Sequence, residues 1–340
     1  MKIADVKEKV AELLQPSEEL IAAITKLDGD ILILGAGGKI GPSLALLARS
    51  AIAGAGISKR VIGVSRFSEP GQKEELEAAG IETLTADLLN EEQLQALPEV
   101  KNVLFLAGTK FGTTGQEPFT WAMNTYLPGR VAEKYRNSNM LVYSTGNIYP
   151  FLPADSGGAT EEQPPEPVGE YGQSCLGRER VFQYFSSRYH IPLLIYRLNY
   201  AIDLRYGVLL EIAKTVKEGR PVSLRTGYVN VIWQGDANEI ALRALQHCST
   251  PPAILNVTGT ETLSVKWLAA EFGKLFGCEV KFTDEVQPTA LLSNASAAER
   301  LFGPPKVSIR QMIELTAAWL EQGGEVLNKP THFQERKGKF

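Results

Sequence analysis

A glycine-rich segment directly after an apolar run restricts the fold of this chain more than any other feature. The run Ile31-Leu32-Ile33-Leu34 leads straight into Gly35-Ala36-Gly37-Gly38-Lys39-Ile40-Gly41, and an amphipathic stretch rich in leucine and alanine follows. A strand, a glycine turn and a helix in this order let the backbone approach a pyrophosphate, whose oxygens then meet the helix amides. The sequence therefore predicts a dinucleotide-binding loop with contacts from Gly35, Gly38, Lys39, Ile40 and Gly41, and a purely structural turn is the alternative.

Similar apolar runs alternate with amphipathic stretches over the first two thirds of the chain. They predict strands at residues 30–34, 60–64, 82–86, 102–106, 140–143 and 192–196. Continuous apolar runs are typical of parallel strands that helices cover on both faces. We therefore expect an α/β fold, a Rossmann-type doubly wound parallel sheet over residues 29–202, preceded by a helical extension at residues 1–28.

From residue 203 the pattern changes to longer helices with short strands. The helices are expected at residues 206–217, 236–246, 265–276, 289–301 and 309–321, and the strands at 229–233 and 254–257. This pattern predicts a smaller C-terminal α/β lobe over residues 203–325, which we expect to hold the substrate. Residues 326–340 have little apolar periodicity and are expected to form a surface tail.

The overall composition excludes several classes of partner and of site. Lys plus Arg number 35 against 39 Asp plus Glu, so no basic surface for nucleic acid or acidic membranes is indicated. The three cysteines and three histidines are widely spaced and predict neither a disulfide framework nor a metal site. There is no apolar run of about 20 residues to cross a membrane, and the first residues lack the apolar core of a signal peptide. We expect a cytoplasmic protein whose partner is a small molecule.

The end of the second predicted strand bears on which dinucleotide is bound. A carboxylate at this point binds the ribose 2′-hydroxyl of NAD, whereas an arginine suits the 2′-phosphate of NADP. Here the strand ends in Ser65 and Arg66 without an acid, and Lys39 lies in the glycine loop. Two cations near a 2′-phosphate favour NADP over NAD, and two solvated surface cations are the alternative.

Four more motifs follow the glycine loop in a fixed order. They are Ala86-Asp87-Leu88, Leu106-Ala107-Gly108, Tyr143-Ser144-Thr145-Gly146-Asn147-Ile148-Tyr149 and Tyr171-Gly172-Gln173-Ser174. Together with the glycine spacing, they resemble the extended short-chain dehydrogenase/reductase family, in its NAD-dependent epimerase/dehydratase branch, over residues 29–320. The resemblance implies that Asp87 and Leu88 contact the adenine and that Ala107 and Gly108 form the wall beside the cofactor. Lys110 follows closely enough to meet the pyrophosphate, although a solvated loop lysine is the more usual finding.

The resemblance also implies a catalytic pair. In this family a tyrosine transfers a proton to or from a substrate oxygen while hydride moves to or from the nicotinamide, and a hydroxyl residue binds the same oxygen. These roles fall on Tyr171 and Thr145. A tyrosine with an ordinary pKa of about 10 needs a nearby cation to act as a base near neutral pH. The family uses a lysine four residues later, which also holds the nicotinamide ribose, and this chain has Cys175 there.

The thiol at position 175 departs from the family pattern. A neutral thiol neither lowers the pKa of a tyrosine as an ammonium does nor offers three donors to a ribose. Three interpretations follow: Tyr171 acts only as an acid, a cation such as Arg178 or Lys110 substitutes, or redox catalysis has been lost. The third corresponds to a non-catalytic NAD(P)-binding sensor or regulatory protein. Cys175 itself is expected to be a small buried side chain, with a reactive thiol as the alternative.

The resemblance further implies a sugar or nucleotide-sugar substrate, converted by an epimerase, a dehydratase or a reductase. Asn199, after the sixth predicted strand, is the candidate substrate contact, and Asn124 is a candidate support for the active-site hydrogen bonds. Either amide can instead be a structural cap or an interior group. Family members often pair through the helices that correspond to residues 118–136 and 171–189, so a homodimer is expected.

Overall fold

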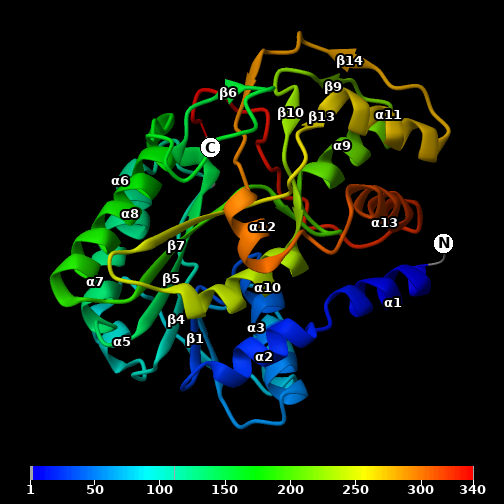
Figure 1. The fold of residues 1–340 in the computed structure, drawn as a ribbon. Coiled ribbons are helices and arrows are strands. Elements are labelled where there is room, and N and C mark those ends of the chain that lie inside the picture. The colour runs from blue at the N-terminus through cyan, green and yellow to red at the C-terminus, as the bar shows by residue number, and fades with distance from the viewer. Residues whose placement is uncertain (1–2, 111, 340) are drawn as a thin grey trace.

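The computed structural model describes residues 3–110 and 112–339, so Met1, Lys2 and Phe340 of the predicted extension and tail lie outside the described residues. Its centre is a seven-stranded parallel sheet with the strand order β12-β7-β5-β4-β1-β2-β3 (Figure 1). The strands are β1 (Ile31–Leu34), β2 (Val61–Ser65), β3 (Glu82–Thr85), β4 (Asn102–Phe105), β5 (Asn139–Thr145), β7 (Leu193–Leu198) and β12 (Ala253–Val257). The strand order reverses between β1 and β4, which confirms the predicted doubly wound sheet.

Helices cover both faces of the sheet because the side chains of each strand alternate between the faces. Ile31 and Ile33 of β1 are fully buried in a core shared with α2, α3 and α10, whereas Leu32 and Leu34 belong to a core shared with α7 and α8. These helices are α2 (Glu18–Lys26), α3 (Gly41–Gly54), α10 (Gln234–Ala244), α7 (Leu127–Lys134) and α8 (Gly169–Tyr189). The apolar run of β1 therefore serves two cores, as expected for a strand covered on both sides.

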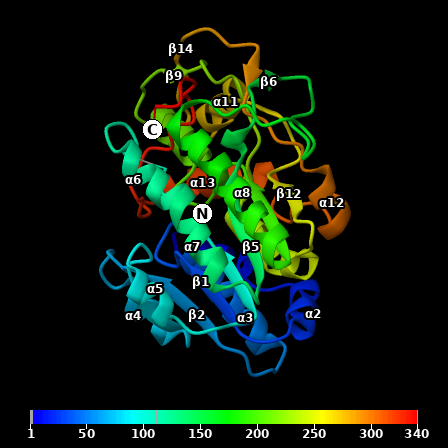
Figure 2. The ribbon, with the colours of Figure 1, turned by 90° about the vertical axis from the view of Figure 1, so that its left-hand side faces the viewer.

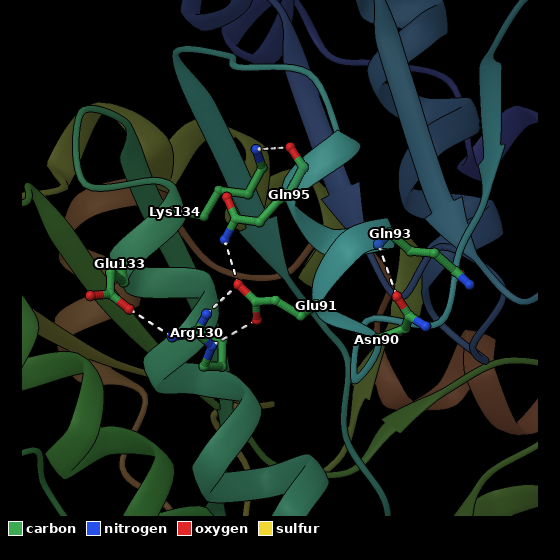
Figure 3. A network of polar contacts seen from close by, with 7 residues as sticks. All are labelled: Asn90, Glu91, Gln93, Gln95, Arg130, Glu133 and Lys134. Carbon is green, nitrogen blue, oxygen red and sulfur yellow. Dashed lines mark hydrogen bonds and ion pairs between the residues drawn. The ribbon is translucent and has the colours of Figure 1, made fainter.

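A polar network joins two of the helices on the second face, α5 (Glu91–Ala96) and α7 (Figure 3). Arg130 of α7 pairs with Glu91 of α5 and with Glu133 of its own helix. Lys134 donates to the backbone carbonyl of Gln95 at 3.0 Å. Exposed ion pairs of this kind add little to the free energy of unfolding. The network instead determines where α5 lies beside α7.

The smaller lobe extends to the top of Figure 2, above β1 and β2 of the sheet. Its core is formed by α9 (Val208–Lys217), α11 (Val265–Phe276) and α13 (Ile309–Glu321), and α1 (Ile3–Leu13) joins this core through Val6. The predicted N-terminal extension is thus divided, because α1 packs on the lobe and α2 packs on the sheet.

Short elements complete the chain. The strands are β6 (Leu152–Pro153), β8 (Ala201–Ile202), β9 (Val222–Ser223), β10 (Tyr228–Val229), β11 (Ile232–Trp233), β13 (Leu263–Ser264), β14 (Phe282–Thr283) and β15 (Thr289–Ala290). The helices are α4 (Gln72–Ala78), α6 (Glu117–Trp121), α12 (Ser296–Phe302), the π-helical turn η1 (Ala122–Tyr126) and the 3-10 turns η2 (Gly146–Ile148) and η3 (Leu245–His247). Several of these strands pair two by two in the lobe and in the loops beside it.

Two elements differ from the sequence prediction. Residues 254–257, predicted as a lobe strand, belong to β12 and pair with β7 at the edge of the central sheet. The chain returns from the lobe to the sheet with α10, which packs on α3 and α2, and local periodicity carries no information about such a return. The helix predicted at residues 289–301 is also wrong in its first half, because Thr289 and Ala290 pair with β6 and α12 begins only at Ser296.

The predicted surface tail is anchored on the protein along its length. Phe333 is 2% exposed and Thr331 is 5% exposed. The backbone amide and the hydroxyl of Thr331 both donate to the Glu211 carboxylate of α9. Lys329 forms an ion pair with Glu69, which lies in the loop after β2. Single side chains at irregular intervals hold this segment, and such anchors produce no apolar period that the sequence could show.

Candidate functional site

A cavity of about 390 Å³ lies where the carboxyl ends of β1, β4, β5 and β7 meet the lobe. The predicted site residues that line it are Gly35, Gly38, Lys39, Ile40, Gly41, Gly108, Lys110, Thr145, Tyr171 and Asn199. Further residues that line it, and that the sequence analysis did not place in the site, include Tyr143, Asn147, Tyr200, Tyr206, Gln234 and Thr331. The cavity therefore brings together residues from the glycine loop, the catalytic strand, α8 and the lobe.

The glycine loop has the geometry that a bound pyrophosphate requires. Gly35 has a φ of +97°, and a Cβ atom there would lie 2.7 Å from the backbone nitrogen of Ala107. A Cβ atom on Gly41 would overlap the backbone of Ala36. At Gly38, by contrast, the nearest atom to an added Cβ is the Gly35 carbonyl oxygen at 3.3 Å. Packing within the protein thus requires the first and third glycines, while the middle glycine keeps space open in front of α3, where a dinucleotide phosphate fits.

Lys39 connects the glycine loop with the lobe. Its ammonium lies 3.5 Å from the centroid of the Tyr206 ring, a cation–π contact. Burial, together with the positive charges of Lys110 and Lys329, lowers the pKa of Lys39 to about 7. A cation with this pKa, beside the glycine amides, can bind an anion and take up a proton as it does so.

Tyr171 and Thr145 line the cavity, and Tyr171 contacts both Thr145 and Cys175. The backbone and side-chain nitrogens of Asn147 both donate to Thr145 Oγ1, at 3.1 and 3.0 Å. The Thr145 hydroxyl hydrogen is therefore left to donate, and Thr145 hydrogen-bonds the Tyr171 hydroxyl. Burial and the neighbouring Cys175 raise the pKa of Tyr171 well above its usual value, while Arg178 and Thr145 act in the opposite direction. Tyr171 is thus a neutral phenol near pH 7.

Cys175 is 1% exposed and packs with Ile148, Tyr149 and Ala159. Burial raises the pKa of its thiol. The side chain is therefore a neutral, buried group in contact with the Tyr171 hydroxyl, and it does not line the cavity.

Lys110 and Arg178 bring positive charge to this end of the cavity. Lys110 Nζ lies 5.5 Å from the centroid of the Tyr171 ring, and burial lowers its pKa to about 8. Arg178, one of the cations weighed as a substitute for the missing lysine, is 6% exposed and also lines the cavity. Its guanidinium donates to the Tyr143 carbonyl at 2.8 Å and to Asn124 Oδ1 at 2.7 Å.

Asn124 lies in the π-helical turn η1 and is fully buried. Its Oδ1 atom accepts from Thr109 N and Arg178 Nη2, and its Nδ2 atom donates to the Thr109 carbonyl and to Ser174 Oγ. Asn199, 3% exposed, makes longer contacts of 3.5 Å to Asn230 and 3.4 Å to the Leu291 carbonyl. The two side-chain amides therefore differ in how firmly they are held: Asn124 makes four short hydrogen bonds, whereas Asn199, beside the cavity, makes the two longer contacts.

The other predicted contacts lie outside the cavity lining: Ser65, Arg66, Asp87, Leu88 and Ala107. Ser65 Oγ lies against Gly37, while Arg66 and Asp87 are exposed. Within residues 3–110 and 112–339, no helix is long and apolar enough to cross a membrane. The same residues contain no group of three or more His, Cys, Asp or Glu side chains placed to hold a metal ion.

The glycine loop, the doubly wound sheet and the Tyr171 helix beside the catalytic strand define the class of this protein, an extended short-chain dehydrogenase/reductase. The family model described as "NAD dependent epimerase/dehydratase family" matches residues 31–257. The chain therefore belongs to the NAD-dependent epimerase/dehydratase family. A search of curated proteins finds no match.

Solved structures share the fold at low sequence identity. A UDP-glucuronic acid 4-epimerase from Bacillus cereus in complex with NAD is 21% identical, with a TM-score of 0.71 over 86% of this chain and 99% of that chain. A UDP-glucose 4-epimerase from Thermotoga maritima with UDP-glucose is 17% identical, with a TM-score of 0.69 over 86% and 99%. A UDP-glucose 4-epimerase from Thermus thermophilus in complex with NAD is 20% identical, with a TM-score of 0.68 over 85% and 97%.

The preference for NADP over NAD was wrong. Similar solved structures are complexes with NAD, which points to NAD. The two cations on which the preference rested are also not directed at one phosphate. Arg66 is exposed and outside the cavity lining, and Lys39 lies over the ring of Tyr206. Nearness in sequence to the end of β2 did not place the Arg66 side chain on the cavity.

Proposed function

We propose that this protein is an NAD-dependent enzyme that acts on a nucleotide sugar, as an epimerase, a dehydratase or a reductase. The observation that carries the proposal is that the glycine loop and the Tyr171–Thr145 pair line one cavity beneath the lobe. Gly38 and its neighbours would hold the phosphates of a dinucleotide, whose nicotinamide would supply the hydride chemistry, and Tyr171 lines the same cavity. Membership of the family and the NAD and UDP-sugar complexes of similar structures support the same cofactor and substrate class.

The residues proposed to bind ligands, inside and outside the cavity lining, divide into a cofactor group and a substrate group. Gly35, Gly38, Ile40 and Gly41 bind the pyrophosphate through the backbone, and Lys39 and Lys110 neutralise its charge. Asp87 and Leu88 after β3 contact the adenosine, with Ser65 at the adjacent ribose. Ala107 and Gly108 form the wall behind the cofactor. The substrate lies between Tyr171 and the lobe, where Asn199, Tyr206 and Gln234 face the cavity.

NAD supplies the hydride acceptor or donor of the reaction. Tyr171 gives its proton to, or takes it from, the substrate oxygen whose carbon changes oxidation state. When the substrate is bound, Thr145 turns its one hydroxyl hydrogen from Tyr171 to the same substrate oxygen, since Asn147 already occupies the acceptor positions of the Thr145 hydroxyl. The buried network below Tyr171 excludes water and keeps the phenol in one orientation.

A homodimer is part of the proposal. Large apolar side chains are exposed on the helices through which a dimer was expected to form: Phe119 and Trp121 on α6, Tyr126 on η1 and Tyr184 on α8. Contiguous exposed aromatic residues are typical of a protein interface. Sedimentation of wild type and of the Tyr126→Glu, Tyr184→Glu double variant measures the assembly state, and a dimer in wild type that the double variant loses is the expected result.

A non-catalytic sensor is the second candidate function, and the buried neutral thiol of Cys175 favours it. Calorimetric titration with NAD, NADH and NADP separates the outcomes. Tight binding of NAD, followed by conversion of a UDP-sugar in a substrate panel monitored by NMR, is the expected result. Binding without conversion of any sugar nucleotide supports the sensor, and the absence of binding to all three dinucleotides contradicts both functions.

A further inference from the structure

Arg178 lies two turns beyond Tyr171 on α8, yet its guanidinium reaches the cavity. The guanidinium fills the space beside Gly108, because a Cβ atom added to Gly108 would clash with Arg178 Nη2. Side chains on a helix lean toward its N-terminus, so a long side chain at position 178 extends back toward position 171. The guanidinium thus lies against Gly108 of the proposed cofactor wall and lines the same cavity as Tyr171.

The charge of Arg178 is held by neutral groups alone. Its two hydrogen-bond acceptors are the Tyr143 carbonyl and the Asn124 amide oxygen, and its buried Nε atom has no hydrogen-bond partner among the described residues. Arg197 illustrates the usual arrangement, because it pairs with the buried Glu179 carboxylate through Nε and Nη2 at 3.0 and 2.7 Å. Burying a cation without a carboxylate is costly, and such groups concentrate at functional sites.

We propose that Arg178 supplies the positive charge that stabilises the phenolate of Tyr171, in place of the cation that Cys175 cannot provide. The inference rests on the proposed function, in which Tyr171 moves a proton. Arg178 is a positioning residue, since it acts through Tyr171 and not on the substrate. Its orientation is fixed by Asn124, whose Oδ1 atom is itself held by the backbone amide of Thr109 at 2.9 Å.

The charged and titratable groups around Tyr171 determine the direction of its proton transfer. Cys175 on α8 opposes its ionisation, Arg178 favours it, and Thr145 on β5 favours it through a hydrogen bond. Lys110 lies over the ring from the loop after β4, Tyr143 on β5 is a buried neutral phenol, and Glu179 is neutralised by Arg197 of β7.

With these groups in place, Tyr171 begins as the protonated phenol. When a carbonyl carbon of the substrate accepts hydride, the Tyr171 O–H bond breaks and its proton goes to the new alkoxide oxygen. The phenolate that remains carries the negative charge, and the guanidinium of Arg178 stabilises it. The same charge lowers the barrier for the reverse transfer, in which the phenolate takes the proton of a substrate hydroxyl.

The test is a direct measurement of Tyr171 ionisation in the cofactor-free protein. Near-ultraviolet tyrosinate absorbance is titrated with alkali in each protein and in the same protein carrying Tyr171→Phe, and the difference isolates Tyr171. Arg178→Gln should shift its ionisation to higher pH by about one unit or more, a tenfold change in the ionisation constant. Arg178→Lys should retain most of the wild-type value. Arg180→Gln, an exposed arginine on the same helix, is the matched control and should have no effect.

A second arm distinguishes charge from structural support. In a Cys175→Lys background a lysine provides the missing charge, so Arg178→Gln should shift the Tyr171 ionisation much less than it does in the wild type. An equal shift in both backgrounds, no shift from Arg178→Gln, or no Tyr171 ionisation before the fold is lost overturns the inference. If Cys175→Lys does not fold, the comparison of Arg178→Lys with Arg178→Gln still tests the inference, because only the loss of the positive charge should shift the ionisation of Tyr171. None of these readouts needs NAD to bind, so failure of the proposed function is recognised separately by calorimetry.

Discussion

The ammonium of Lys39, in the glycine loop, lies 3.5 Å from the centre of the Tyr206 ring, in the lobe. The backbone of the same residue is also tied to the lobe side, because the Gln234 side chain donates to the Lys39 carbonyl at 3.4 Å. One residue of the proposed phosphate site therefore contacts two elements that border the proposed substrate site. In the proposed function, the charge of Lys39 contributes to the binding of the cofactor phosphates.

Affinity for NAD should fall as the pH rises through the pKa of Lys39, which burial lowers to about 7. Below that pH the ammonium is charged and attracts the pyrophosphate, and above it the amine is neutral. The dissociation constant should therefore rise with pH by at most about tenfold per pH unit. Calorimetry across a pH series measures the change, and proton uptake on binding should make the heat depend on the buffer.

Lys39→Met should flatten this pH profile near neutrality. Lys110, whose pKa burial lowers to about 8, adds a more alkaline component that Lys110→Met should remove. Arg66→Met is the matched control, because Arg66 is exposed and outside the cavity lining. An unchanged slope in Lys39→Met would show that another group titrates.

The three glycines of the loop should respond differently to alanine. Gly41→Ala forces a Cβ atom into the backbone of Ala36, so it should lower the free energy of unfolding by about 1–3 kcal/mol. Gly38→Ala meets only the Gly35 carbonyl at 3.3 Å and should leave the cofactor-free protein nearly as stable as wild type. It should nevertheless weaken NAD binding strongly, because the added methyl group occupies the phosphate position. Urea unfolding and calorimetry measure the two effects, and tight NAD binding by Gly38→Ala would contradict the assignment.

The buried pair Arg197–Glu179 should be the most sensitive ionic contact of the fold. Glu179→Gln leaves the Arg197 guanidinium without its carboxylate, at a site where the two side chains are 3% and 0% exposed. Removing one partner of such a pair costs about 3–5 kcal/mol of unfolding free energy. Glu91→Gln, in the exposed network of Figure 3, is the control and should leave the urea midpoint unchanged. If Glu179→Gln and Glu91→Gln lowered the free energy of unfolding equally, burial would not determine the contribution of an ion pair.

Phe333 should make the C-terminal segment part of the folded unit. It is 2% exposed within the core of the lobe, and Phe333→Ala should cost about 3–5 kcal/mol through lost burial and the cavity left behind. Because the adjacent Thr331 lines the proposed site, NAD affinity should fall as well. Lys337→Ala, at an exposed position nearby, is the control for unfolding and calorimetry. A stable Phe333→Ala protein would contradict the anchoring of the segment.

Local patterns predicted the parts of the fold that local interactions determine. The helices at 265–276 and 309–321 have the predicted bounds, because amphipathic residues fill them and Ser264 and Ser308 cap their first turns. The glycine loop was predicted for the same reason, since strand, turn and helix are consecutive. The place of β12 in the sheet and the anchors of the C-terminal segment were not predicted, because their partners are distant in sequence: β12 pairs with β7, and Lys329 pairs with Glu69.

The site illustrates the same limit. Arg178 lies seven residues after Tyr171 in the sequence, about two helical turns along the axis, so the sequence gives no direct sign that its side chain reaches the same cavity. The rise per residue gives the separation of the two backbone positions along the helix axis. A long side chain that leans toward the helix N-terminus covers much of that separation. The preference for NADP overestimated nearness in sequence. Arg66 directly follows the end of β2, but its side chain is exposed.

Tyr171→Phe should separate binding from chemistry. It removes only the phenolic oxygen, so NAD affinity should stay within about threefold of wild type while turnover of a verified substrate falls by about 10²–10⁴. Thr145→Val removes the hydroxyl that hydrogen-bonds Tyr171 and should also lower turnover while NAD still binds. Calorimetry gives the affinity, and steady-state rates across pH give the turnover. Tyr184→Phe, an exposed tyrosine on the same helix, should match wild type in both measurements. Unchanged turnover in Tyr171→Phe would assign the proton transfer to another group, and Lys110, 5.5 Å from the ring centre, would be the first to test.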